Sequence, residues 1–467
     1  MMDFVKEEWV HLGQWVQPTL SAGFWDGWTQ ESRNYPFSAP PLGGRLIILH
    51  GHHFVRRDDV DMLRKFLLEN KNNFQLLRTF EQWVDGIHQK CKEEIVYSFP
   101  TPIEKIKKLQ ELCHDIVNPW IFFILVGIVV EENIQEFCTE NDYSFQDMLQ
   151  IIKPIRKAFA VLQTESADLL LEKIAHAGLS PNIALIERKN PDLANEIKKH
   201  IAQFEFVGVH HFVGKPYSLE QFFNTILHRK QNIKGKDIPA DLIWWTDLAS
   251  IAAWARTHMA ETSGYIQHSA RTTLIHVNTM LQLDEGDYLW LTVDEIIRLL
   301  NNPTSFLKPN LAERKEKVGI YSERGEEVVV AGKDVDALLD LLLQKEETRV
   351  FPLYGMIASQ GKVVGKARIV IRPEDIEKVM IGDILVAPET SPDFIVGMKR
   401  AKGVITNQGG ITSHAAIVSR ELGVPCLVGV NGATSLITDG DLIELDAEKG
   451  EVNKVTSIDI INKIDLS

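Results

Sequence analysis

The sequence changes character at one place, around residues 344–352. Before it, apolar residues recur mostly at helical spacing. After it, short apolar runs such as GKARIVI, GDILVAPE, GVITN and PCLVGV are separated by glycines. Helical periodicity predicts helices packed on helices, and short β-rich runs between turn residues predict a compact α/β unit. We therefore predict a multidomain α + α/β protein, with a large, mostly α-helical domain at 1–343, a hinge linker at 344–352 and a compact β/α domain at 353–467.

The helical prediction for the first part depends on helix-start signals as well as periodicity. In TPIEKIKKLQELC, Thr101 is placed as an N-cap, Pro102 as the first helical residue and Glu104 as the third residue of a capping box. Similar starts occur at Ser144, Ser218 and Thr292. Few segments before residue 345 alternate as strands do, so we expect little sheet there.

Composition excludes several classes of protein. Fifty Lys and Arg against 64 Asp and Glu give a net charge of −14, which disfavours nonspecific nucleic-acid binding. The four cysteines are far apart and form no CxxC pair, so neither a zinc site nor a disulfide framework is indicated. Reduced, buried thiols in a cytoplasmic protein are expected.

No segment of the sequence is predicted to be a signal peptide or a membrane span. MMDFVKEEWV has acidic residues and no apolar core of the kind that a secretory signal needs. WIFFILVGIVV, residues 120–130, is the most apolar run, but it is well short of the ~20 residues that cross a bilayer. It predicts a helix buried on all sides, and we expect no membrane partner.

One histidine lies in the segment GGITSHAAIVSREL, residues 409–422. The preceding KGVITN is predicted to be a strand. HAAIVSREL contains good helix formers, with Thr412 or Ser413 as the N-cap and Gly423 ending the helix. The order is strand, glycine loop, helix and strand, which places His414 in the first turn of the helix.

That position is suited to holding a phosphate. The first turn of a helix has free N–H groups and the positive end of the helix dipole, and the adjacent Gly409 and Gly410 allow close approach to the backbone. A ring nitrogen of His414 could attack phosphorus, and the helix end would lower the pKa of the imidazole and keep its lone pair available. From these residues alone, a histidine that merely caps and packs the helix stays open as the alternative, because a glycine pair before a helix is common.

The longer segment GGITSHAAIVSRELGVPCLVG closely resembles the signature around the phosphorylated histidine of the PEP-utilising enzymes. That family includes phosphoenolpyruvate synthase, pyruvate phosphate dikinase and the rifampin phosphotransferases. ASQGKVVGKARIVI, GDILVAPETSPDFIVGMKRAKGVIT and ATSLITDGDLIELDAEKGEV resemble the flanking motifs, so the likeness extends over nearly all of residues 353–452. Gln408 is a departure, since many relatives carry an acidic residue there.

The resemblance implies that residues 353–467 are a swivelling phosphohistidine domain, which moves between a nucleotide site and an acceptor site. It implies that His414 is the catalytic residue that carries the phosphoryl group. The positions that it matches around the phosphate are Gly409, Gly410, Thr412, Ser413 and Thr390.

Two parts of the complete family enzymes have no counterpart in this sequence. There is no GxxxxGK[ST] loop, and the region before residue 345 is predicted to be helical rather than an ATP-grasp domain. Only about 50 residues follow His414, too few for the (β/α)₈ barrel of phosphoenolpyruvate synthase. The layout instead resembles the helical and histidine domains of rifampin phosphotransferase, with a weaker match at residues 269–302, and the histidine-bearing subunit of split systems such as phenylphosphate synthase.

This layout predicts a component that works with a partner. We expect a separate ATP-grasp protein to load His414, with ATP and Mg²⁺ bound mainly by that partner and no cofactor bound by this chain. The acceptor is expected to be a small molecule held by the helical domain. Two alternatives stay open: a carrier loaded from phosphoenolpyruvate, and a non-catalytic binding or regulatory protein that keeps the fold.

Two histidine clusters, HGHH at residues 50–53 and VHHFVGKPY at 209–217, are further candidates. They fit hydrogen-bonded loop histidines, a general base for an acceptor hydroxyl, or metal ligands. No Cys or carboxylate stands at a diagnostic spacing, so no metal site is predicted. The candidate acceptor-pocket residues are His52, His53, His210 and His211.

Overall fold

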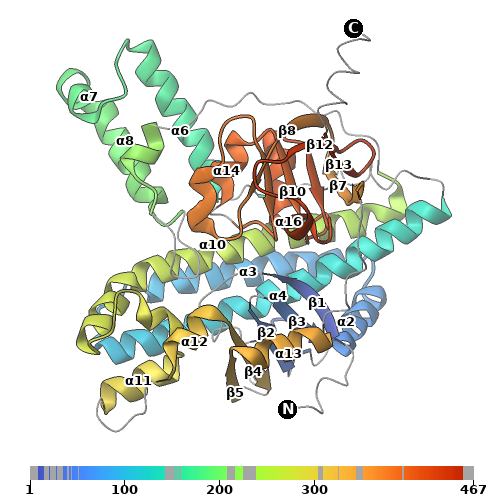
Figure 1. Ribbon diagram of the computed structural model, residues 1–467, viewed down its shortest axis with the longest axis horizontal. Coiled ribbons are helices and arrows are strands. Elements are labelled where there is room, and N and C mark those ends of the chain that lie inside the picture. Colours follow the sequence, from blue (N-terminus) through green and yellow to red (C-terminus); the bar gives the residue numbers. More distant parts are fainter. Residues whose placement is uncertain are drawn as a thin grey trace.

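The computed structural model describes residues 9–14, 20, 28, 35–38, 42–43, 45–50, 52–141, 143, 152, 155–156, 159–207, 216–223, 238–302, 309–323, 326–342, 351–391 and 394–455. Within these ranges the chain forms a helical body, a five-stranded sheet, a small helical unit and an eight-stranded sheet (Figure 1). The predicted multidomain α + α/β class is confirmed. The predicted boundaries stay a prediction, because most of the hinge, residues 344–350, lies outside the described residues.

The helical body is built around two long helices, α4 (Pro102–Glu140) and α10 (Ile243–Met280). They lie side by side below the carboxyl-terminal sheet in Figure 1. Their buried side chains share one large core with those of the neighbouring helices. The capping boxes predicted at Thr101 and Thr292 are both formed. The helices of the body are α2 (Arg57–Glu69), α3 (Phe74–Glu94), α4 (Pro102–Glu140), α10 (Ile243–Met280), α11 (Val293–Asn301) and α12 (Leu311–Glu316), with the short 3₁₀ turns η3 (Ala240–Leu242) and η4 (Asp287–Trp290).

Helix α4 contains the apolar run at residues 120–130. The helix is long and apolar enough to cross a membrane by length and composition, but 78% of its most apolar window is buried inside the fold. A core helix passes the same test. Most of the run itself is fully buried against the other helices, as the sequence predicts.

The amino-terminal region also contains a sheet that the sequence analysis missed. Its five antiparallel strands run in the order β1-β3-β2-β4-β5. The central strand β2 does not alternate because both of its faces are buried: Leu46 and Ile48 face the helical core, whereas Ile47 and Leu49 pack towards α13. The strands are β1 (Trp9–Gln14), β2 (Arg45–Leu49), β3 (His52–Arg56), β4 (Val318–Glu323) and β5 (Glu326–Ala331), and α13 is Lys333–Leu342.

A small helical unit projects beside the carboxyl-terminal sheet and has a core of its own (Figure 1). Val207, at its edge, packs against both this core and the core of the carboxyl-terminal domain. The helix start predicted at Ser218 is formed, since Ser218 and Gln221 exchange capping hydrogen bonds, whereas the start predicted at Ser144 lies outside the described residues. The helices are α6 (Phe159–His176), α7 (Ile183–Lys189), α8 (Pro191–Phe204) and α9 (Leu219–Phe223).

The carboxyl-terminal domain is an eight-stranded sheet of order β6-β13-β12-β8-β9-β10-β11-β7. Strands β8 to β11 are mutually parallel and the outer strands antiparallel, and separate apolar cores lie within the domain. The strands are β6 (Leu353–Tyr354), β7 (Met356–Ser359), β8 (Lys362–Ile369), β9 (Ile384–Ala387), β10 (Gly403–Thr406), β11 (Cys426–Val428), β12 (Leu442–Asp446) and β13 (Glu451–Lys454). The helices are η5 (Pro373–Lys378), α14 (Ile395–Arg400), α15 (His414–Leu422) and α16 (Ala433–Leu436).

A largely buried ion pair joins two helices of the body and predicts a measurable stability effect. Two guanidinium nitrogens of Arg314 donate to the two oxygens of Glu295 at 2.7 and 2.8 Å. Arg314→Met leaves the largely buried carboxylate of Glu295 without its charged partner. We therefore expect the free energy of unfolding to fall by about 3 kcal/mol in urea titrations. The exposed pair of Lys198 and Glu187 is the control, and Lys198→Met is expected to cost less than about 1 kcal/mol. Equal losses would contradict this account.

Candidate active site at the start of helix α15

The histidine segment forms the predicted strand, loop and helix. Strand β10 ends at residue 406, and α15 begins at His414. Ser413 is the N-cap, and its hydroxyl accepts a hydrogen bond from the Ala416 N–H at 3.4 Å. Gly423 ends the helix in the left-handed conformation, with φ of 64°. His414 therefore lies in the first turn at the carboxyl end of a parallel strand, where open α/β sheets commonly bind ligands.

The His414 ring is oriented by a neighbouring loop. Its Nδ1 lies 2.9 Å from the hydroxyl oxygen of Thr390, a buried residue in the loop that follows the parallel strand β9. The other ring nitrogen, Nε2, is shielded from solvent. Of the predicted phosphate-site residues, the structure thus brings His414 and Thr390 into direct contact, although they are 24 positions apart in the chain.

This contact predicts a positioning role for Thr390. Thr390→Val keeps the shape of the side chain but removes the oxygen that fixes the ring, so we expect phosphorylation of His414 to slow by about tenfold to a hundredfold. Thr390→Ser keeps the hydroxyl and is expected to retain most of the rate. Single-turnover phosphorylation of the two variants measures the difference, and equal rates would argue against the role.

The two glycines before the helix are needed for different reasons. Gly409 has φ of 111°, a conformation that side-chain-bearing residues rarely adopt, and a Cβ there would lie 2.9 Å from the Ser413 side chain. A Cβ on Gly410 would lie 2.2 Å from a carboxylate oxygen of Glu131, which belongs to helix α4. The loop therefore has to be glycine-rich both for its own turn and for contact with the helical body.

Hydrogen bonds and an apolar side chain join the helical body to the histidine loop. Glu131 of α4 accepts a hydrogen bond from the Ile411 N–H at 3.3 Å, and Arg256 of α10 donates to the Thr412 hydroxyl at 2.9 Å. The Ile411 side chain is fully buried and belongs to the core of the helical body. Gly127 of α4 permits the approach, because a Cβ there would lie 2.6 Å from the Thr412 hydroxyl oxygen. In this conformation the histidine domain is docked.

The charges at this interface are shielded from water. Burial raises the pKa of Glu389 to about 8 and that of Glu131 to about 7, and the positive charge of Arg256 opposes both shifts. The Ile411 N–H also opposes the shift at Glu131. Burial lowers the pKa of Arg256, and the two carboxylates oppose that change. Two carboxyl groups thus share one close guanidinium beside the histidine loop.

A second arginine supports the loop from within the histidine domain. Arg420, near the end of α15, donates to the Ile411 carbonyl oxygen at 2.7 Å. Burial lowers the pKa of Arg420 to about 10. The backbone of Ile411 is therefore held on both sides, through its N–H by the helical body and through its carbonyl by α15.

The sequence pattern does not mark Glu131 or Arg256 as part of a site. Both belong to long helices that are remote in sequence from the histidine segment, and nothing in the local pattern joins them to it. The available signal was the position of each charge: Glu131 directly follows the apolar run of α4, and Arg256 lies in IAAWARTHMA, where most neighbours are apolar. A charged side chain in a buried stretch indicates a nearby hydrogen-bonding or oppositely charged group, because an isolated buried charge is costly.

The four candidate acceptor-pocket histidines are placed differently. His53 is fully buried in strand β3 of the amino-terminal sheet. His52 lies in the same strand, but its side chain is outside the described residues, as are His210 and His211 entirely. Among the described residues, no group of three or more His, Cys, Asp or Glu could hold a metal. A role in the acceptor pocket stays a prediction for these four residues.

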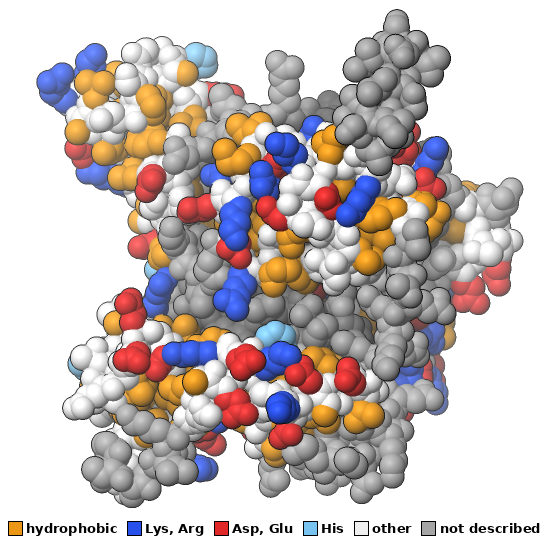
Figure 2. All heavy atoms as spheres, viewed as in Figure 1, with side chains coloured by type: hydrophobic (Ala, Val, Ile, Leu, Met, Phe, Trp, Pro, Cys, Tyr) orange, Lys and Arg blue, Asp and Glu red, His pale blue; other side chains and the backbone are white. Residues whose placement is uncertain are grey.

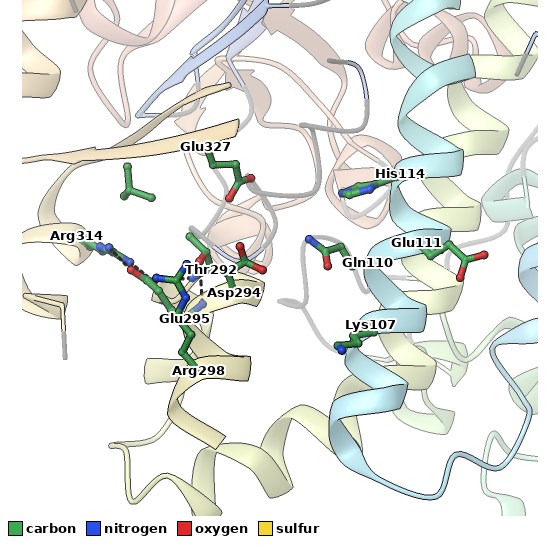
Figure 3. Close-up of a pocket in the computed structure, with 11 residues that line it drawn as sticks. Lys107, Gln110, Glu111, His114, Thr292, Asp294, Glu295, Arg298, Arg314 and Glu327 are labelled. Carbon is green, nitrogen blue, oxygen red and sulfur yellow. Dashed lines mark hydrogen bonds and ion pairs between the residues drawn. The ribbon is translucent and has the colours of Figure 1, made fainter. Parts of the chain in front are cut away.

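A cavity of about 680 Å³ lies between α4 and α11, with β5 and α12 at its margin. Figure 3 shows Lys107, Gln110 and His114 on one wall and Asp294 and Arg298 on the other. Glu131 is about 17 residues beyond the histidine of this wall along α4, a rise of about 25 Å. The cavity is therefore separate from the histidine loop and is not the place where a group on His414 would be transferred in the docked conformation.

The fold and loop define a class of domain: a β/α unit that presents one oriented histidine at a helix N-terminus. Residues 380–450 match the family described as "PEP-utilising enzyme, mobile domain". Residues 380–450 of the carboxyl-terminal unit thus carry the mobile domain of the PEP-utilising enzymes, as the resemblance in the sequence implies.

Similar proteins carry related names. The probable phosphoenolpyruvate synthase of Methanothermobacter thermautotrophicus is 43% identical over 106 residues, which are 23% of this chain and 16% of that protein. The phosphoenolpyruvate synthase of Pyrococcus furiosus is 46% identical over 109 residues, 23% of this chain and 13% of that protein. An uncharacterized phosphotransferase of Bacillus subtilis, YvkC, is 24% identical over 289 residues, 57% of this chain and 34% of that protein.

These matches differ in extent. This chain spans about a sixth or less of the length of the two phosphoenolpyruvate synthases. The match to YvkC spans 57% of this chain, more than the carboxyl-terminal domain contains, so it extends into the helical region.

Proposed function

We propose that this chain is a phosphotransferase component that carries a phosphoryl group on His414. A separate ATP-grasp protein loads the group from ATP, and the histidine domain passes it to a small-molecule acceptor held by the helical domain. The observation that carries this proposal is the position of His414 in the first turn of α15, with Nδ1 at 2.9 Å from the Thr390 hydroxyl. The names of the similar proteins, phosphoenolpyruvate synthase and phosphotransferase, agree with phosphoryl transfer.

The geometry assigns different tasks to the two ring nitrogens. With its proton on Nδ1, His414 donates to Thr390, and the lone pair is on Nε2. Nε2 then attacks the phosphorus of the donor, the P–O bond to the leaving group breaks, and a P–N bond forms. In the second half-reaction an acceptor hydroxyl oxygen attacks the same phosphorus and releases its proton to water, and the electron pair of the P–N bond returns to Nε2. The N-terminus of α15 stabilises the anionic group in both steps.

The donor site is assigned to the partner. ATP and Mg²⁺ are expected there, where the metal neutralises charge on the nucleotide phosphates. Phosphoenolpyruvate is the alternative donor. A non-catalytic module is the alternative of another class, and it predicts that no donor phosphorylates His414. We propose a cytoplasmic location.

The test uses the full chain together with a candidate ATP-grasp partner. β-labelled and γ-labelled ATP are supplied in parallel, so that the labelled product reveals which phosphoryl group moves. We expect an acid-labile, base-stable label on this chain that depends on the partner. Labelling by phosphoenolpyruvate without the partner would favour the alternative donor, and no label from either compound would favour the non-catalytic module.

A further inference from the structure

The docked conformation places a carboxylate of the helical body on the loop that is suited to an anion. Glu131 accepts from the Ile411 N–H, and its Oε2 occupies the space that a side chain on Gly410 would need. This loop leads directly into the N-terminus of α15, where backbone N–H groups favour a negative charge. At pH values above its raised pKa of about 7, Glu131 is therefore an anionic group from another domain, bound where the phosphohistidine loop would be expected to bind phosphate oxygens.

We propose that Glu131 takes the place of an anion on the histidine loop when His414 is unmodified, so that the helical body holds the unphosphorylated histidine domain more tightly than the phosphorylated one. This inference rests on the proposed function. The docked conformation is then the state of the protein after transfer of the phosphoryl group. Once the group has left His414, Glu131 binds the loop, and the histidine domain has to be released before His414 is loaded again.

Space is the first reason for a difference between the two forms. In the docked conformation Nε2 of His414 is shielded from solvent. The fit around the loop is close, because Gly127 and Gly410 both face atoms that would overlap with an added Cβ. A phosphoryl group on His414 adds a phosphorus and three oxygens at this shielded nitrogen, so the atoms that cover it have to move to accommodate the group.

Charge is the second reason. A phosphoryl group brings a charge of about −1.5 to −2. The charged groups that face the loop from the helical body are Glu131 on α4 and Arg256 on α10, and Glu389 faces Arg256 from the histidine domain itself. Glu132 also lies close enough to act on Glu131 and adds negative charge. Among the described residues, Arg256 thus faces two carboxyl groups already, and Arg420 donates to the Ile411 carbonyl oxygen from within the histidine domain. A phosphoryl group has to compete with Glu131 for the loop.

The experiment measures docking with and without phosphate on His414 and needs no enzyme partner. Phosphoramidate is the phosphoryl donor: its P–N bond breaks, a P–N bond to the histidine forms, and ammonia leaves. Spin labels at Val96→Cys and Ile381→Cys, both exposed positions, report the separation of the two domains. The four native cysteines are buried and should not react with the label. ³¹P NMR, compared with the same reaction of His414→Ala, reports separately whether phosphohistidine has formed on His414.

We expect one docked distance before phosphorylation and a population of longer distances after it. In Glu131→Ala the phosphorylated domain is expected to stay docked, with a docked-to-undocked ratio roughly tenfold or more above that of the unmodified sequence. Glu131→Gln keeps the shape without the charge and should lie between the two. Glu136→Gln, at an exposed position of the same helix, is the matched control and should behave like the unmodified protein.

The possible contrary results are distinct. If ³¹P NMR shows phosphohistidine and the docked distance does not change, the release by phosphorylation is wrong while the proposed function stands. If Glu131→Ala and Glu136→Gln respond alike, Glu131 is not the group that discriminates. If His414 stays unphosphorylated with phosphoramidate and also with ATP and the ATP-grasp partner, the proposed function itself fails, and this inference fails with it.

Discussion

His414→Ala is expected to abolish the acid-labile phosphoryl label on this chain. The ring nitrogen is the nucleophile in the proposed transfer, and no other group in the loop can replace it: Thr412 and Ser413 are buried, and their hydroxyls are already used by Arg256 and by the helix cap. The label should fall to the background of a partner-only reaction. Scintillation counting after alkaline and acidic washes measures it.

The control for this variant is His276→Ala, which removes an exposed histidine from helix α10. It should leave labelling unchanged. Full labelling of His414→Ala would show that the phosphoryl group is carried elsewhere, and the assignment of the site would be wrong.

Gly127→Val is expected to separate loading from transfer. A Cβ on Gly127 already lies 2.6 Å from the Thr412 hydroxyl oxygen, and the valine methyl groups extend further into the docked loop. The histidine domain can then still meet its loading partner but not the helical body. We expect the rate of His414 labelling to be retained and the rate of transfer to the acceptor to fall by roughly a hundredfold or more.

A matched variant distinguishes this effect from damage to a helix. Gly86→Val makes the same change inside helix α3, where an added Cβ meets no atom within 4 Å. Both variants gain the same helix propensity, roughly 0.5 kcal/mol, because valine is a better helix former than glycine, so this contribution cancels in the comparison. Equal transfer rates in the two variants would show that docking through α4 is not required for transfer.

Local chemistry made the carboxyl-terminal site predictable. Three residue types in this segment are typical of the structure that they form. Gly409 adopts a positive φ, Ser413 caps the helix and Gly423 ends it. The glycine loop, the helix and the place of His414 therefore follow from a segment of about 15 residues. The contact of Thr390 with the ring came only from the family resemblance, because nothing in the local pattern of PETSPD points to a residue 24 positions away.

Long-range pairing explains what the sequence did not reveal. Strand β2 pairs with β4, although more than 250 residues separate them, and its two buried faces hide the alternation that marks a strand. Glu131 and Arg256 reach the histidine loop through the packing of one domain on another. Neither residue has a helical or strand periodicity that marks it as part of a site, so only their charge within buried stretches was informative.

The most direct test of the central claim is to map the phosphorylated residue after incubation with ATP and the ATP-grasp partner. Peptides are prepared and sequenced by mass spectrometry at neutral to alkaline pH, where a phosphohistidine survives. We expect one modified residue, His414, in the peptide that contains GGITSHAAIVSR, with the modification absent from His414→Ala. Stoichiometric phosphate on any other residue, or an unmodified His414 while transfer proceeds, would contradict it.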